Sequence, residues 1–286
     1  MKKAILGLSV ILISLNACKK VEVQLPKTSN LTQELNLLNE KYSQYQSPNY
    51  YKTNWNWDRD LGGAGLGFAL GSATTTPIGG AFCGIAWGIG CSALKKPAPT
   101  YPLNYITNNS NWVLTNAHWY NSTLFYDFDN FNPYREFGVK HNIALDYIQN
   151  RVTKEELFNG IEGYFQFLND SLGGNYNITG LDSMRLKFYS ACDLTDAGFT
   201  TDTNSVKDFY SSAVSNSLIP SDSTIVLNAS KQYAKILYKD LSDSIVNDYT
   251  KNFCITVSNS GITSAQKAAI LQIISLSLHS YSYWKN

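Results

Sequence analysis

The sequence predicts a mainly α-helical protein, and three observations support that fold class. Apolar side chains recur at helical spacing, helix-start patterns precede some of these segments, and strand-like alternation is scarce. We expect a glycine-rich helical hairpin and a C-terminal multi-helix domain. The expected parts are a signal peptide (1–17), a lipid-anchored tether (18–30), an N-terminal helix with the hairpin (31–96) and a helical domain (97–286).

The first part of the chain has the layout of a secretory signal. Two lysines precede an apolar stretch over residues 4–15, which is too short to span a bilayer. The segment that follows, "LNAC", resembles the lipobox of bacterial lipoproteins, in which the cysteine, here Cys18, is acylated and becomes the N-terminus. A plain cleaved signal is the alternative. We expect a mature protein held by lipid on the outer membrane, facing the periplasm or the cell exterior.

The next regular segment is a predicted helix in "LTQELNLLNEKYSQY". Its apolar side chains are three or four residues apart and fall on one stripe, and Pro48 limits the helix at its C-terminal end. The members of the stripe are Leu31, Leu35, Leu38, Tyr42 and Tyr45.

Residues 61–94 contain ten glycines and no charged side chain. Six of the glycines form two runs spaced by four, which would give each arm of a helical hairpin a smooth face for close packing. These are Gly63, Gly67, Gly71, Gly80, Gly84 and Gly88. The arms are shorter than the ~20 residues of a spanning helix. A buried or self-associating hairpin is favoured, while membrane contact and a loop stay open.

Beyond a proline-rich linker at 97–102, the sequence predicts an irregular segment that enters a helix near Gly138. A capping-box pattern at 153–156 opens another helix. Further helices are expected at about 181–190, 203–218, 227–248 and 263–284, the last opening with "TSAQ".

Composition limits the chemistry. The net charge of +1 gives no broad basic surface for nucleic acid. With three histidines and no ligand-pair motif, neither a metal site nor a cofactor is expected. If Cys18 carries lipid, Cys83, Cys91, Cys192 and Cys254 are left, and three full pairings, a single disulfide or none stay open.

The one candidate functional cluster lies around "REFGVKHNIALDYI". It comprises Glu136, His141, Asn142 and Asp146, in which a histidine base with a carboxylate partner is conceivable. The favoured alternative is that His141 packs at the start of a helix whose apolar positions, Ile143, Leu145 and Ile148, face the core. No catalytic residue is assigned.

Two motifs carry a resemblance to a group of uncharacterised bacterial surface lipoproteins. The group combines a lipobox, a segment rich in alanine and glycine, a G-x-x-H-N-x-x-L-D element and a terminal helix ending in Tyr, Ser and Trp. The matching residues here are Gly138, His141, Asn142, Leu145 and Asp146, then Tyr281, Ser282, Tyr283 and Trp284. The resemblance implies a location and a domain layout, and no activity.

Together these observations favour a non-enzymatic lipoprotein that binds a protein or glycan, or associates with copies of itself. The numerous tyrosines and asparagines suit adaptable contacts. The alternative is a membrane-active, toxin-like protein that uses the glycine hairpin. A hydrolase or glycan-acting enzyme is less favoured, because only common carboxylates support it.

Overall fold

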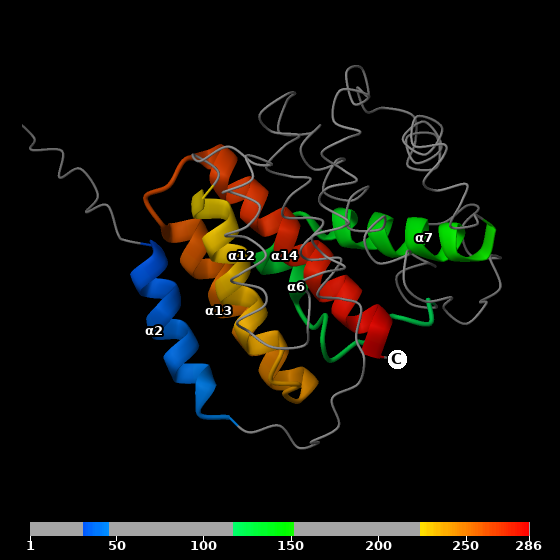
Figure 1. The fold of residues 1–286 in the computed structure, drawn as a ribbon, viewed down its shortest axis with the longest axis horizontal. Coiled ribbons are helices and arrows are strands. Elements are labelled where there is room, and N and C mark those ends of the chain that lie inside the picture. The colour runs from blue at the N-terminus through cyan, green and yellow to red at the C-terminus, as the bar shows by residue number, and fades with distance from the viewer. Residues whose placement is uncertain (1–30, 46–116, 152–223, 286) are drawn as a thin grey trace, which may run out of the picture.

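The computed structural model describes residues 31–45, 117–151 and 224–285, and these residues form α-helices and no strands (Figure 1). The helices are α2 (Leu31–Ser43), α6 (Phe128–Phe131), α7 (Arg135–Arg151), α12 (Thr224–Leu237), α13 (Asp243–Asn259) and α14 (Ser264–Lys285). The predicted mainly α class is confirmed. The signal, the tether, the glycine hairpin and the helices expected within 152–223 lie outside the described residues.

Four of the helices pack into a bundle, and a fifth crosses it. Helix α12 contacts α2, α13 and α14, and α13 also contacts α2 and α14. Helix α7 makes its contact with α14, the most extensive helix pair among the described residues, and runs across it in Figure 1. The long C-terminal helix therefore joins the bundle to α7.

Helix α14 is buried on nearly every side. All its residues from Ala269 to Tyr283 are buried, serines included. Its start is a capping box, because the Thr263 backbone N–H donates to Gln266 Oε1 (3.1 Å) and the Gln266 N–H donates to Thr263 Oγ1 (3.2 Å). The predicted opening of this helix is confirmed.

Helix α2 is attached to the bundle by apolar and polar contacts. Leu31, Leu35 and Tyr42 are buried, whereas Leu38 is half-buried and Tyr45 is exposed, so the expected stripe is correct for three of its five members. Asn39 completes this face. Its Nδ2 donates to the Gln232 carbonyl (2.9 Å), and its Oδ1 accepts from Tyr249 Oη (2.8 Å).

The single helix predicted over 227–248 is wrong, because the chain turns between α12 and α13. Asp240 adopts the left-handed region, with φ 48°, where an α-helix cannot continue. Its carboxylate lies 3.5 Å from Lys285 Nζ at the end of α14. The turn is thus held by a partner distant in sequence, without the glycine or proline that usually marks such a break.

Helix α7 begins at Arg135, earlier than the expected start near Gly138, and the short α6 precedes it. Asp127, just before α6, has φ 58°, and its carboxylate accepts a hydrogen bond from Asn130. Asn132 separates the two helices, with its Oδ1 accepting from the Tyr134 N–H (3.0 Å). The segment looked irregular in sequence because its turns depend on these short-range side-chain bonds.

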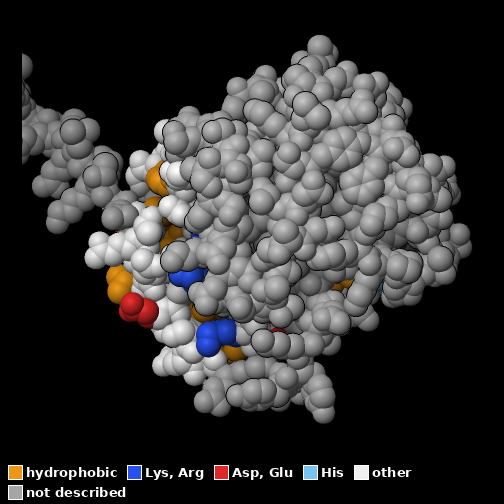
Figure 2. Space-filling view, viewed as in Figure 1, with side chains coloured by type: hydrophobic (Ala, Val, Ile, Leu, Met, Phe, Trp, Pro, Cys, Tyr) orange, Lys and Arg blue, Asp and Glu red, His pale blue; other side chains and the backbone are white. Residues whose placement is uncertain are grey.

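No helix in the described ranges combines the length and apolar character needed to cross a membrane. On the face in Figure 2, hydrophobic side chains of the described part emerge in small groups among polar and charged ones. The large apolar side chains exposed in the described part of the chain are Leu37, Tyr45, Tyr126 and Ile255. Tyr126 is the most exposed of them, at 73%.

Candidate functional site

The crossing of α7 and α14 is built around Gly138. A Cβ atom at this position would lie 2.2 Å from His279 Nδ1 and 2.6 Å from the Ser275 carbonyl oxygen, closer than real Cβ contacts. The Gly138 backbone N–H also donates to Ser275 Oγ (3.3 Å). The first residue of the G-x-x-H-N element is therefore a packing residue that lets two helices approach.

The histidine and the asparagine of that element, His141 and Asn142, are fully buried at the same crossing. Asn142 Nδ2 donates to the His279 carbonyl (2.9 Å), so its Oδ1 is directed at His141 Nδ1 (3.0 Å). Because an amide oxygen only accepts, His141 Nδ1 carries the proton. Asn142 thus joins the two helices and orients the ring of its neighbour His141.

His279 occupies an aromatic enclosure beneath the loop that leads to α6. Its ring centroid lies 4.3 Å from that of Phe125, 5.7 Å from Phe128 and 5.9 Å from Trp119. Nδ1 donates to the Ser275 carbonyl (2.7 Å), and the enclosed Nε2 has no hydrogen-bond partner within the described residues. Burial lowers the pKa of His279 to about 3, so the ring is neutral at ordinary pH.

The structure describes one of the two carboxylates of the expected cluster, that of Glu136, and it does not lie at the crossing. Glu136 is exposed on α7, with Oε2 3.8 Å from Lys140 Nζ one turn along the helix. Asp146 is on the same helix, but its side chain is outside the described residues. Positions five apart, such as 141 and 146, differ by about 140° around a helix axis. The structure therefore brings His141 together with Asn142 and His279, and places Glu136 on the surface.

A buried asparagine and a cysteine form a second polar contact in the interior. Asn132 Nδ2 donates to the Leu271 carbonyl (2.9 Å) and lies 3.7 Å from Cys254 Sγ. Cys254 is a free thiol, and burial raises its pKa. The other cysteines lie outside the described residues, as do Cys18 and the six hairpin glycines. In the described ranges no three His, Cys, Asp or Glu side chains are grouped to hold a metal ion.

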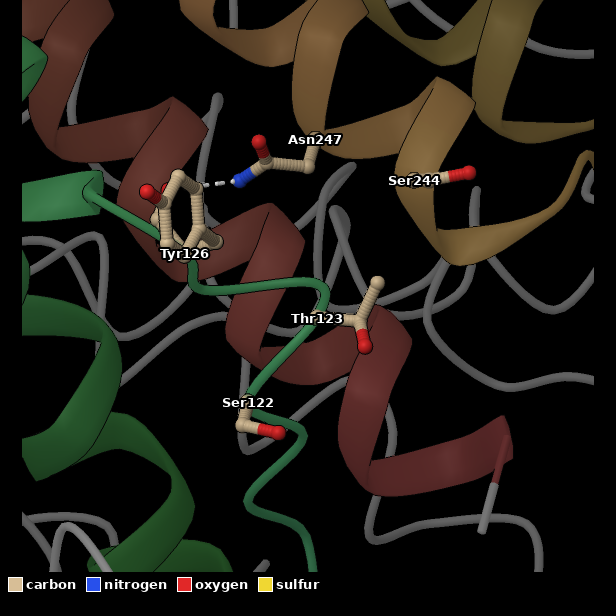
Figure 3. A pocket seen from close by; sticks show the side chains of 5 residues that line it. All are labelled: Ser122, Thr123, Tyr126, Ser244 and Asn247. Atoms are coloured by element: carbon tan, nitrogen blue, oxygen red, sulfur yellow. Dashed lines mark hydrogen bonds between the residues drawn. The ribbon is translucent and has the colours of Figure 1, made fainter.

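The described part of the chain lines a depression with a volume of about 350 Å³, where a ligand can reach polar side chains (Figure 3). Its lining comes from two elements, the loop before α6 and the first turns of α13. The lining residues are Ser122, Thr123, Tyr126, Ser244 and Asn247. None of these side chains carries a charge, and four of them bear a hydroxyl group.

Two asparagines hold the loop side of the depression in place. Asn247 Nδ2 donates to the carbonyls of Leu124 (2.8 Å) and Tyr126 (3.0 Å), and Figure 3 shows its side chain directed at the loop. Asn121 Oδ1 accepts from the Thr123 N–H (3.1 Å), while its Nδ2 donates to an Asp243 carboxylate oxygen (2.8 Å). Sequence reasoning missed this site, because its two halves are about 120 residues apart and neither half contains a motif.

Comparison with protein-family models, with curated proteins and with solved structures finds no match for this chain. Its functional residues are therefore assigned from geometry. The histidines at the helix crossing are enclosed, and the hydroxyl-lined depression is open to solvent.

Proposed function

We propose that this chain is a lipid-anchored lipoprotein of the bacterial outer membrane whose helical part has a binding role and no catalytic one. It faces the periplasm or the cell exterior. The observation that carries the anchor is the N-terminal sequence, in which a basic start and an apolar stretch lead to "LNAC" and Cys18. Each acyl methylene buried in a bilayer contributes about 0.8 kcal/mol, so two or three chains hold a protein firmly.

The binding role is favoured over catalysis by the state of the two histidines at the helix crossing. A general base works best when its pKa is near the operating pH and when it can reach the substrate. His279 meets neither condition, because its pKa is lowered to about 3 and its ring is enclosed. His141 is also fully buried, with Nδ1 engaged by Asn142. These groups serve the packing of α7 on α14.

The anchor is tested by Cys18→Ser in the native host. We expect the wild-type chain in washed membranes with incorporated radioactive palmitate, and the variant in the soluble fraction without label. Asn16→Ala is the matched control, because it changes the same segment, keeps the cysteine and should leave the chain acylated and membrane-bound.

Persistence of unlabelled Cys18→Ser in carbonate-washed membranes would refute the lipid anchor. It would favour the alternative in which the glycine hairpin of residues 61–94 enters the bilayer, and Gly67→Leu and Gly84→Leu would then be the variants to compare.

A further inference from the structure

We propose that the depression between the loop before α6 and the start of α13 binds a neutral sugar unit of a glycan. This inference rests on the proposed binding role and names the ligand class. The site is defined by Ser122, Thr123, Tyr126, Ser244 and Asn247.

The chemistry of the lining selects for neutral, hydroxyl-rich ligands. Ser122, Thr123, Tyr126 and Ser244 each bear a hydroxyl that both donates and accepts, which matches the hydroxyls of a sugar. The described lining residues include no charged side chain to offset the desolvation of a phosphate, carboxylate or ammonium group. Charged ligands are thus disfavoured.

Tyr126 supplies the apolar surface that such a ligand also needs. Tyr126 is 73% exposed, although the buried Phe125 and Phe128 anchor the chain on either side of it. An aromatic ring presents a negative face, which attracts the weakly positive C–H groups on one face of a pyranose. Tyrosine therefore combines a stacking surface with a hydroxyl at its edge.

The loop that presents Tyr126 is fixed before any ligand arrives. Leu124 and Phe125 are buried, and Asn247 binds the backbone carbonyls of Leu124 and Tyr126. On the α13 side, Ser244 lies in the first turn of a regular helix, with its Oγ 3.3 Å from Ser242 Oγ. Little conformational freedom is lost on binding, which favours affinity for a small ligand.

The size of the depression limits the ligand to one or two sugar units. Its volume of about 350 Å³ is at the low end of the ~300–1,000 Å³ found for ligand sites. Because the depression is shallow, much of the sugar stays in water, and we expect a Kd on the order of 1 mM for a single unit. Several lipoproteins on one membrane would raise the apparent affinity for a polymeric glycan.

The test uses the full chain, purified in detergent from whichever fraction of the native host contains it. The probes are four neutral disaccharides (maltose, cellobiose, lactose and N,N′-diacetylchitobiose) and an anionic heparin disaccharide, each up to about 20 mM, observed by saturation-transfer-difference NMR. We expect at least one neutral probe to bind, and Tyr126→Ala to weaken it about tenfold or more. Tyr126→Phe keeps the ring and should lose less affinity than Tyr126→Ala.

The matched control is Tyr45→Ala, which removes another exposed tyrosine that does not line the depression. It should leave the Kd within about twofold, because an isolated surface substitution away from the site has little effect. Ser244→Leu fills the α13 side and should also weaken binding about tenfold or more, while circular dichroism confirms that each variant is folded.

Three results would overturn the sugar site: no neutral probe bound, equal binding by Tyr126→Ala and wild type, or binding of the heparin disaccharide alone. Failure here is separate from failure of the anchor. A wild-type chain that is acylated and membrane-bound but binds no sugar removes only this site, whereas an unlabelled chain that binds sugar removes only the anchor.

Discussion

Gly138→Ala should destabilise the fold although alanine is the better helix former. In most helix interiors this change stabilises by about 1 kcal/mol. Here the new methyl would lie 2.2 Å from His279 Nδ1, 2.4 Å from its Cγ and 2.6 Å from the Ser275 carbonyl oxygen. The ring cannot swing away freely, because Ser275 binds its Nδ1 and Phe125, Phe128 and Trp119 surround it.

The magnitude follows from the movement that alanine would impose. The Ser275 oxygen belongs to the backbone, so reaching an ordinary contact of 3.4 Å requires α7 and α14 to separate by about 0.8 Å. A gap of that size removes a quarter to a half of the dispersion energy of about 60 atom pairs worth ~0.15 kcal/mol each, or about 2 to 4 kcal/mol. After the gain in helix propensity, about 1 to 3 kcal/mol of net destabilisation is expected.

The assay is urea unfolding followed by circular dichroism, with Glu136→Ala as the matched control. Glu136 is on the same helix and exposed, so its replacement should change the free energy of unfolding by less than about 0.5 kcal/mol. In the double variant Gly138→Ala/His279→Ala the two closest contacts, both with the ring, are absent, and the Ser275 carbonyl oxygen remains. The destabilisation of this double variant should be at least about 1 kcal/mol smaller than the sum of the two single changes.

An unchanged or raised urea midpoint for Gly138→Ala would refute the close approach of α7 and α14. A strictly additive double variant would show that the His279 ring is not the obstacle.

Two further predictions concern pH and the attachment of α2. Burial lowers the pKa of His279 from 6.5 to about 3, so the unfolded chain takes up a proton first as the pH falls. The free energy of unfolding therefore has its full value above about pH 6.5 and falls as the pH drops from 6.5 to 3. By pH 5 the loss amounts to about 2 kcal/mol. Urea midpoints measured from pH 7 to pH 4 should fall less steeply in His279→Leu, and equal slopes would contradict this account. Asn39→Ala removes hydrogen bonds to Gln232 and Tyr249 and should lower the free energy of unfolding in urea by about 1 to 3 kcal/mol. The control is Asn36→Ala on the exposed side of α2, which should change it very little. Equal effects of the two variants would show that α2 is held by apolar packing alone.

The parts of the fold that could be predicted from sequence are those with short-range signals. The apolar stripe within residues 31–45 predicted helix α2 and three of its buried residues, and the segment beginning at Thr263 predicted the start of α14. Both signals lie within a few residues of what they specify. Apolar periodicity did not reveal Asn39, because a buried amide has no characteristic spacing.

The parts that could not be predicted depend on partners distant in sequence. The turn at Asp240 contains no glycine or proline and is tied to Lys285 on α14. Sequence alone singled out His141 and Asn142, but their role depends on His279, which is 137 residues from Asn142. The depression joins Tyr126 to Asn247 across 121 residues. A single sequence does not show which distant residues meet in the fold, so it gives no signal for these contacts.

The buried crossing and the surface depression belong to one structural unit. The His279 ring packs on Gly138, and its centroid also lies 4.3 Å from the ring centroid of Phe125, the residue before Tyr126. On the next turn of α14, Ser282 Oγ donates to the carbonyl of Trp119, at the other end of the same loop. Helix α14 thus supports the loop from beneath while α13 binds it from the side through Asn247. The neutral, enclosed histidine therefore acts as a structural support for the surface on which the proposed sugar would bind.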